Sequence, residues 1–256
     1  MNKLTPIFFF TTFLFTTICA QQTFIPDDNF EQALIDLGVD DNLDDYVLTS
    51  IVYTLAGIDL SNKNISDLTG IEDFEFLEYL DCSNNLLNEL NLENNPFLKQ
   101  LNCSSNNLSS IEIGNNIELE YLNTSNNLLS EINITNNINI SYFDCSSNEL
   151  STIDISNNTL LNFFYSNNNN SNCITVWDVE FASLVETMCN NDSCFVKDDN
   201  ATWSLDCGGL NFESHNFAIP GLIREYNILG KNINHNKLFI EIYENGSSKK
   251  KFFLDN

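Results

Sequence analysis

Apolar residues recur along the middle of the chain with a step of 21 positions. Leucine or phenylalanine returns at this step in one register, and asparagine returns at the same step in two others. The apolar series is Leu80, Leu101, Leu122, Phe143 and Phe164; the asparagine series are Asn85, Asn106, Asn127, Asn148 and Asn169, and Asn95, Asn116, Asn137 and Asn158. A fixed period of this length predicts a solenoid, in which each unit forms one coil and stacks on the next.

Within one unit, apolar and polar positions alternate in two places. In the unit that starts at Leu77, inward positions fall at Leu80 and Cys82, and again at Leu90 and Leu92. A period of two predicts a short strand at each place, and therefore two strands per coil. The asparagine after each strand predicts a bend, because its side chain bonds backbone groups and tolerates turn conformations. Stacked asparagines are also expected to bond neighbouring coils as a ladder.

Three cysteines lie inside this repeat. Cys82, Cys103 and Cys145 share one register with Thr124 and Ser166, so the position takes a small inward side chain. A free cysteine behaves there as a small buried hydrophobe. A redox pair or a metal site would need a His or a second Cys at ligand spacing, which these units do not offer. We therefore interpret the three as buried thiols.

The repeat unit L-x-x-L-D-C-S-N-N-x-L-x-x-L-x-L-x-N-N resembles the leucine-rich repeats of secreted Bacteroidetes proteins, from Leu55 to about Asn172. Residues 24–50, FIPDDNFEQALIDLGVDDNLDDYVLTS, resemble the segment that precedes such repeats. The predicted fold class is a mostly β repeat solenoid with a short N-terminal capping helix, a disulfide-tied C-terminal cap and a small β segment at the end. The expected parts are a signal peptide (1–20), an N-terminal cap (21–52), leucine-rich repeats (53–172), a C-terminal cap (173–209) and a partial sorting-domain-like β segment (210–256).

A helix is expected to cover the first coil, because a solenoid needs closed ends. Asp27 or Asp28 can cap its start, and Gly38 follows its end. The apolar face of this helix is predicted to carry Phe30, Leu34 and Leu37.

An acidic cluster follows this helix, at Asp40, Asp41, Asp44 and Asp45. A calcium site is one interpretation, but no bidentate glutamate or glycine stands at the spacing of a calcium loop. We favour a solvated acidic turn, and we predict no metal site and no cofactor.

Four cysteines follow the last coil, at Cys173, Cys189, Cys194 and Cys207. Their even number and loop setting favour disulfides, and three pairings are open. We prefer Cys189–Cys194, which closes a small loop, and Cys173–Cys207, which ties the cap together. Trp177 and Trp203 are expected to fill this cap. The stretch CITVWDVEFA, residues 173–182, resembles the closing segment of the same proteins.

Residues 1–20, MNKLTPIFFFTTFLFTTICA, have the charged start and apolar run of a secretory signal peptide, with cleavage expected after Ala20. The apolar run from Ile7 to Ile18 is too short to span a bilayer, and no later segment is long and apolar enough. The mature chain is therefore expected outside the cytoplasm, where its cysteines meet oxidising conditions.

Residues 223–256 resemble the end of a type IX secretion sorting domain. IREYNILGKNI, residues 223–233, is similar to its strand–turn signature around Gly230. LFIEIYENGSSKKKFFLDN, residues 238–256, is similar to its last hairpin, with Asn245-Gly246 as the turn. The resemblance implies the type IX secretion machinery as a partner, and a secreted or outer-membrane location in a Gram-negative, Bacteroidetes-like bacterium. The usual upstream N-P motif is absent, so an inactive signal is the alternative.

The charge of the chain narrows its partners. The net charge of -26 over 256 residues argues against nucleic acid, because few groups can neutralise phosphates, and against anionic bilayers. The hydrophobic fraction of 43% is enough for a core. The two histidines, His215 and His235, lie in asparagine-rich surroundings and suggest no catalytic arrangement. We therefore expect no enzyme activity.

The outward strand positions form the candidate binding surface. One column contains Tyr79, Gln100, Tyr121, Tyr142 and Phe163, and the next contains Asp59, Asp81, Asn102, Asn123, Asp144 and Tyr165. Exposed aromatics beside polar groups are typical of recognition surfaces. We therefore predict that a protein or glycan ligand contacts the four aromatics of the first column together with Asp81, Asn102, Asn123 and Asp144 of the second. The alternative is that the tyrosines only stabilise the sheet by cross-strand pairing. The predicted function is thus a binding module for recognition or adhesion, with a structural scaffold that has no discrete ligand as the alternative.

Overall fold

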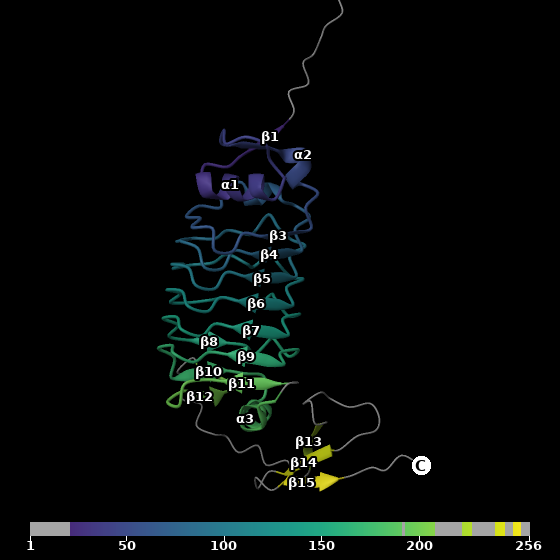
Figure 1. Ribbon diagram of the computed structural model, residues 1–256. Coiled ribbons are helices and arrows are strands. Elements are labelled where there is room, and N and C mark those ends of the chain that lie inside the picture. Colours follow the sequence, from purple (N-terminus) through teal and green to yellow (C-terminus); the bar gives the residue numbers. More distant parts are fainter. Residues whose placement is uncertain (1–20, 191–192, 208–221, 227–238, 244–247, 252–256) are drawn as a thin grey trace, which may run out of the picture.

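The structure, a computed structural model, describes residues 21–190, 193–207, 222–226, 239–243 and 248–251. The expected signal peptide, Gly230, the Asn245-Gly246 turn and both histidines lie outside these residues. The described chain contains a column of stacked coils (Figure 1). The predicted mostly β leucine-rich-repeat solenoid is therefore confirmed.

One long parallel sheet runs along the stack. Its order is β11-β9-β7-β6-β5-β4-β3, and each strand pairs in register with the next. The strands are β3 (Gly57–Asp59), β4 (Tyr79–Asp81), β5 (Gln100–Asn102), β6 (Tyr121–Asn123), β7 (Tyr142–Asp144), β9 (Phe163–Tyr165) and β11 (Cys194–Val196). From β3 to β9, the central residue of each strand points into the core, and the two flanking residues point outward.

The prediction of a second strand in every coil is wrong. A second sheet, in the order β12-β10-β8, forms only at the end of the stack, from β8 (Ile153–Asp154), β10 (Cys173–Thr175) and β12 (Thr202–Ser204). In the earlier coils the corresponding segments share one isolated β-bridge, between Asn91 and Glu112. The bonds between coils there are few, and two are long: Glu112 N to Leu90 O is 3.2 Å and Leu92 N to Glu112 O is 3.3 Å. Leu90 and Leu92 are nonetheless buried, so their alternation reports burial rather than a strand.

Two asparagine ladders join the coils, as predicted. In the first, each side-chain amide donates to backbone carbonyls of its own coil and of the preceding coil; Asn106 Nδ2, for example, lies 3.0 Å from Cys82 O and 3.1 Å from Cys103 O. The residue just before each first-ladder asparagine has a positive φ between 54° and 59°, which lets the chain bend sharply. In the second ladder, Asn137 Nδ2 donates to Ile113 O and to Asn116 O.

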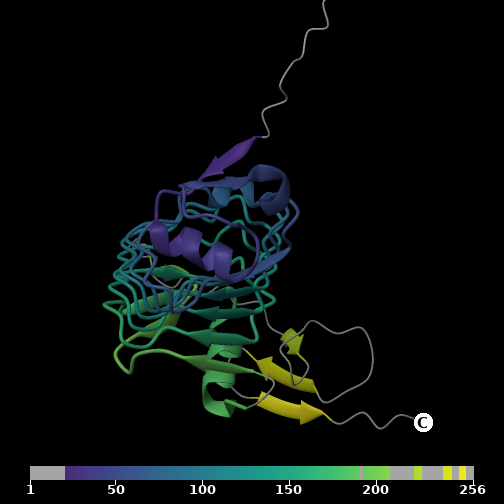
Figure 2. The same cartoon turned by 45° about the horizontal axis from the view of Figure 1, so that its top comes forward.

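The N-terminal cap closes one end of the stack (Figure 2). It contains β1 (Gln22–Phe24), α1 (Asp28–Asp36), β2 (Tyr46–Leu48) and α2 (Thr49–Val52), and the short helix η1 (Ile71–Asp73) follows in the first coil. Asp27 caps α1 by accepting bonds from the backbone N–H groups of Asn29 and Phe30. The ring of Phe30 stacks on that of Phe74, with centroids 6.1 Å apart, so α1 covers the core of the first coil.

The prediction that Leu37 lies on the buried face of this helix is wrong. Its exposed fraction is 51%, whereas Phe30, Ala33 and Leu34 are buried. The helix ends at Asp36, and Leu37 is the capping residue before Gly38, whose φ of +73° turns the chain away. The turn is stabilised because the next N–H, that of Val39, donates back to Leu34 O at 2.9 Å.

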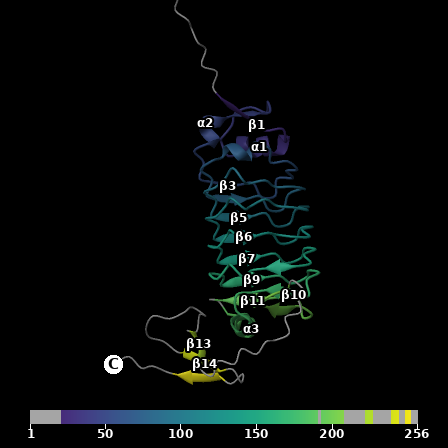
Figure 3. The same ribbon diagram turned by 180° about the vertical axis from the view of Figure 1, so that it is seen from behind.

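The C-terminal cap closes the other end, around α3 (Val179–Met188) (Figure 3). The structure contains the two preferred disulfides, Cys173–Cys207 and Cys189–Cys194. Trp177 and Trp203 pack in an aromatic cluster around Phe195, and the Trp203 indole donates to Glu186 at 2.7 Å.

A further antiparallel sheet joins β13 (Leu222–Tyr226), β14 (Phe239–Tyr243) and β15 (Ser248–Lys251). None of the helices in the described part of the chain has the length and apolar character that a bilayer crossing requires.

Candidate functional site on the outward face of the parallel sheet

The parallel register places outward side chains of successive coils directly above one another. Tyr121 of β6 pairs with Tyr142 of β7, and Tyr142 pairs with Phe163 of β9. All three are half-buried, while the residue that follows each of them is fully inside the core. The step of 21 residues thus converts a one-dimensional repeat into a column of side chains about 4.8 Å apart.

Four aromatic side chains form one cluster, which we name the aromatic patch: Tyr121, Tyr142, Phe163 and Tyr165. The rings of Tyr121 and Tyr142 are stacked, with centroids 4.5 Å apart and planes 13° apart. Tyr142 also meets Phe163 at 6.1 Å and Tyr165 at 5.8 Å, both in tilted geometry. Sequence reasoning did not include Tyr165 among the contact residues; it occupies the register of the acidic and amide column, and only its aromatic character marked it out.

The predicted column of aromatics is interrupted. Gln100 of β5 separates Tyr79 from Tyr121, and the Tyr79 side chain instead lies over Gly57 of the preceding coil, where an added Cβ would be 3.4 Å from that of Tyr79. The exposed fraction of Tyr79 is 39%. The structure therefore joins three of the four predicted aromatics and leaves Tyr79 apart.

The polar residues in the neighbouring outward column stabilise the turns that follow the strands. In four of them one side-chain oxygen accepts two bonds, from the backbone N–H and the hydroxyl of the serine two positions later. These residues are Asp81, Asn102, Asn123 and Asp144. The amide of Asn102 also donates to Asp81 Oδ2 at 3.0 Å. The column thus fixes the turn after each strand, and only Asn123 and Asp144 lie on strands that also carry a residue of the aromatic patch.

Burial raises the pKa of the Tyr142 phenol well above its usual value, and the neighbouring Tyr121 and Asp144 raise it further. Burial also raises the pKa of Tyr79, together with the charges of Asp81 and Asp59. Both hydroxyls therefore stay protonated at neutral pH and can donate hydrogen bonds. The patch offers flat apolar faces with polar tips, a combination that suits non-covalent recognition.

A second exposed apolar feature lies in the turns that lead into the strands. Phe76 and Phe97 stack with centroids 5.4 Å apart, and Tyr53 meets Phe76 edge-on at 4.9 Å. In the next two coils the exposed apolar residues are Ile117 and Ile138, each one residue before the position equivalent to Phe97. Their exposed fractions are 56% and 54%. Sequence reasoning missed this row, although both pairs are spaced by 21 residues.

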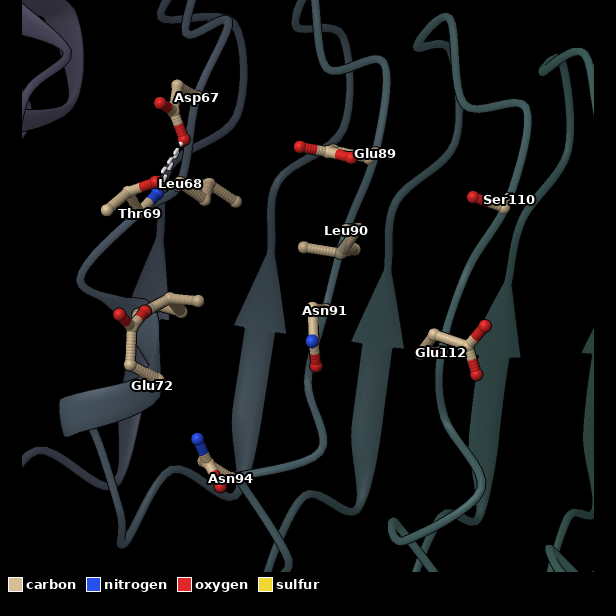
Figure 4. Close-up of a pocket in the computed structure, with 11 residues that line it drawn as sticks. Asp67, Leu68, Thr69, Glu72, Glu89, Leu90, Asn91, Asn94, Ser110 and Glu112 are labelled. Carbon is tan, nitrogen blue, oxygen red and sulfur yellow. Dashed lines mark hydrogen bonds between the residues drawn. The ribbon is translucent and has the colours of Figure 1, made fainter.

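An acidic hollow of about 410 Å³ lies on the side of the first coils that carries Leu90 and Asn91, where no regular second sheet forms (Figure 4). Its lining includes the carboxylates of Asp67, Glu72, Glu89 and Glu112 and no basic residue. Two of these carboxylates also hold backbone: Asp67 accepts from Thr69, and Glu72 accepts from Gly70 N. The hollow can receive a cationic group, such as a lysine side chain of a partner.

No protein-family model and no curated protein matches the chain. Solved structures do match. The functional domain of InlJ from Listeria monocytogenes, described as including a cysteine ladder, is 24% identical over 70% of this chain and 44% of that chain, with a TM-score of 0.56. The leucine-rich-repeat ectodomain of a membrane receptor kinase from Arabidopsis thaliana is 22% identical over 51% of this chain and 19% of that chain (TM-score 0.42). A leucine-rich-repeat protein of Leptospira interrogans is 15% identical over 61% and 51% (TM-score 0.43).

The likeness to the InlJ domain shows that this chain has a leucine-rich-repeat fold of the kind seen in bacterial internalins. The chain spans less than half of that domain's length. The free, fully buried Cys82, Cys103 and Cys145 lie in one register of the repeat, as the sequence predicted.

Proposed function

We propose that this protein is a binding module that recognises a protein or glycan ligand through the aromatic patch. The observation that carries the proposal is the stacked, half-exposed pair of Tyr121 and Tyr142 on the outward face. The fold does not require aromatic residues there, because Gln100 fills the same position in the neighbouring coil. Tyrosine presents a large contact area at a small cost in conformational entropy, and stacking reduces that cost further because each ring holds the other.

The charge around the aromatic patch favours one class of ligand. Asp81 and Asp144 lie in the adjacent column, and Glu120 directly precedes Tyr121, within a chain of net charge -26. A ligand whose surface combines an apolar or sugar-ring face with basic or hydrogen-bond-donating groups therefore suits the patch. The alternative function is a surface scaffold without a discrete ligand, which the contact between the two tyrosine rings also favours, since cross-strand pairs stabilise sheets.

The test compares two double variants. Tyr121→Ala with Tyr142→Ala removes the stacked rings, whereas Tyr121→Phe with Tyr142→Phe keeps the rings and removes only the hydroxyls. Binding is measured against a glycan array and against surface proteins from the natural surroundings of the organism. We expect the alanine pair to weaken binding of any ligand at least tenfold, because truncating a contact aromatic typically costs more than about 1 kcal/mol and each 1.4 kcal/mol is a factor of ten.

The melting temperature separates the two functions. Lost binding at an unchanged melting temperature supports recognition, and lost stability without lost binding supports the scaffold. Phe76→Ala with Phe97→Ala, in the other exposed aromatic row, is the matched control. A ligand bound equally well by the Tyr121 and Tyr142 alanine pair would place the site elsewhere on the solenoid.

We also propose that the protein is exported and that residues 210–256 act as its sorting segment for a type IX system in a Gram-negative, Bacteroidetes-like host. The antiparallel arrangement of β13, β14 and β15 is compatible with this role. The proposed division is a cap (21–52), repeats (53–172), a second cap (173–209) and this segment. Deleting residues 223–256 should leave the protein in the periplasm of a host that has the system; normal surface amounts of the truncated protein would show that the segment is inactive.

A further inference from the structure

A buried carboxylate in the N-terminal cap has hydrogen-bond partners at only one of its two oxygens. Glu31 of α1 has an exposed fraction of 0%. Its Oε1 accepts bonds from the backbone N–H groups of Asp44 and Tyr46, at 2.8 and 3.1 Å. Its Oε2 is buried and has no hydrogen-bond partner. A charged oxygen buried without a partner is strongly unfavourable, so this atom calls for a cation beside it.

Two further carboxylates lie close to that of Glu31. Asp28, at the first turn of α1, Glu31 and Asp45, just before β2, each place one carboxylate oxygen within 4.8 Å of the other two. Glu31 is buried, and the other two are exposed. None of the ion pairs found among the described residues involves these three groups. Three negative charges so close together repel one another unless a positive charge lies between them.

We propose that Asp28, Glu31 and Asp45 bind a calcium ion, independently of the aromatic patch. All three ligands are hard carboxylate oxygens, which calcium and magnesium prefer. Two oxygens on opposite sides of Ca²⁺ are about 4.6–5.2 Å apart, whereas around Mg²⁺ they are about 4.0–4.2 Å apart. Oxygens that lie within 4.8 Å of one another can share one calcium ion, whereas Mg²⁺ demands a near-ideal octahedron and gives up its waters reluctantly, so a set of only three protein oxygens favours calcium. The ion lies at the edge of the cap, and water completes its coordination from the side of Asp28 and Asp45.

The surrounding backbone holds the ligands in place. Asp45 has a left-handed backbone, with φ 68°, and its carbonyl accepts a bond from Ile25 N at 2.8 Å. The two bonds to Glu31 Oε1 fix the chain on either side of Asp45, so the same carboxylate that would bind the ion also shapes the loop. Calcium would thereby join the start of α1 to the strand β2 and hold the cap closed over the first coil (Figure 2).

This site differs from the acidic turn considered from sequence. Only Asp45 comes from that cluster, and the other two ligands come from one face of the helix, three residues apart. No loop motif joins them, because residues 32–44 separate the two parts and the fold alone brings them together. For Asp45 the proposal departs from the prediction of a solvated acidic turn, and the experiment below decides between the two.

The test is thermal unfolding of the mature chain with increasing CaCl₂, against NaCl of equal ionic strength and against MgCl₂. With three protein carboxylates the dissociation constant is expected at about 10⁻⁴–10⁻³ M. At a dissociation constant of about 0.5 mM, 10 mM calcium raises the folding equilibrium constant about 20-fold, and the melting temperature rises accordingly. MgCl₂ should have a clearly smaller effect.

Two variants decide whether the response arises at this site. Glu31→Gln keeps an oxygen for the two backbone N–H groups and removes the charge, so it should fold, be at least as stable as the wild type without calcium, and lose the calcium response. Asp45→Asn tolerates the left-handed backbone and should weaken calcium binding at least tenfold. Asp36→Asn, on the same helix but outside the cluster, is the control and should keep the response. If calcium has no more effect than NaCl, or if Glu31→Gln responds like the wild type, the proposal is wrong.

Discussion

Asn127 of the first ladder is predicted to contribute far more stability than Asn137 of the second, although both are buried asparagines of the same coil. Asn127 Nδ2 donates to Cys103 O and Thr124 O, both at 3.0 Å. Its Oδ1 accepts the bond of Leu108 N at 3.0 Å. In Asn127→Ala, the two carbonyls keep other donors, but the buried N–H of Leu108 is left without a partner.

The magnitude follows from these contacts. An orphaned buried donor costs about 1–3 kcal/mol, and each lost hydrogen bond costs about 0.5–1.5 kcal/mol. One orphaned donor and two lost bonds together are therefore expected to reduce the free energy of unfolding of Asn127→Ala by about 2–6 kcal/mol, centred near about 4 kcal/mol. Asn137 donates to Ile113 O at 3.0 Å and to Asn116 O at 2.8 Å, but its own Oδ1 is buried without a partner. Its replacement by alanine loses two bonds and removes one unsatisfied acceptor, so the expected cost is about 0–1 kcal/mol.

Equilibrium unfolding in urea, followed by circular dichroism, measures both variants. The loss of side-chain volume is the same in each, so cavity effects largely cancel in the difference. From the central values of the two costs, we expect Asn127→Ala to be the less stable variant by about 3–4 kcal/mol. Equal costs would refute the reasoning, and would mean that the two ladders are satisfied to the same extent in solution. A change in the slope of the transition would show that single coils unfold separately, in which case fragment-wise hydrogen exchange replaces the two-state analysis.

Three further predictions concern titratable groups. Burial raises the pKa of Cys103 to about 12 and the pKa values of Cys82 and Cys145 well above the usual value. Iodoacetamide at pH 8 should therefore label none of the three in the native protein, and should label only these three in the unfolded, unreduced mature chain. Mass spectrometry that finds any of them in a disulfide contradicts this. Burial raises the pKa of Asp27, but hydrogen bonds from Ser66, Phe30 and Asp67 outweigh it and lower the pKa, so its stabilisation is present above the usual carboxyl pKa and is lost as the pH falls through the lowered value; Asp27→Ala should cost about 2–3 kcal/mol at pH 7 and much less at pH 2 in urea titrations. The pKa of Tyr142 is raised, so the folded state holds this proton more tightly than the unfolded state, and stability should be constant below pH 10 and fall as the pH rises above it; a Tyr142→Phe variant that shows the same alkaline loss as the wild type would contradict this assignment.

The repeat itself was predictable because its period is a direct consequence of stacking. A coil must return each core residue to the same place, so Leu80, Leu101 and Leu122 had to recur at a fixed step, and the register then placed Tyr121 beside Tyr142. The asparagine ladder was predictable for the same reason. Burial was read correctly at Leu90 and Leu92, but the backbone bonds there were not, because alternation reports which side chains face the core and not how the main chain is paired.

The rest depended on contacts that no local pattern carries. Leu37 is exposed because α1 ends at Asp36, one residue before it, and Gly38 then turns the chain away from the core. The approach of Asp45 to Glu31 depends on the path of the loop between them. The pair of hydrogen bonds that each serine donates to the polar column was also missed. A side chain that points outward was assumed to be free for a ligand, whereas Asn123, for example, already accepts two bonds from Ser125.

The register of the sheet also bears on how such a chain can change over evolutionary time. From β4 to β9 each coil bonds only the coils on either side, and its core residue meets its equivalents one unit away. Duplication of 21 residues within the repeats would therefore lengthen the outward face by one strand spacing of about 4.8 Å and leave both caps intact. A gene that gains or loses whole units can thus adjust the span of the surface that it presents, whereas an insertion of any other length must be accommodated as a loop.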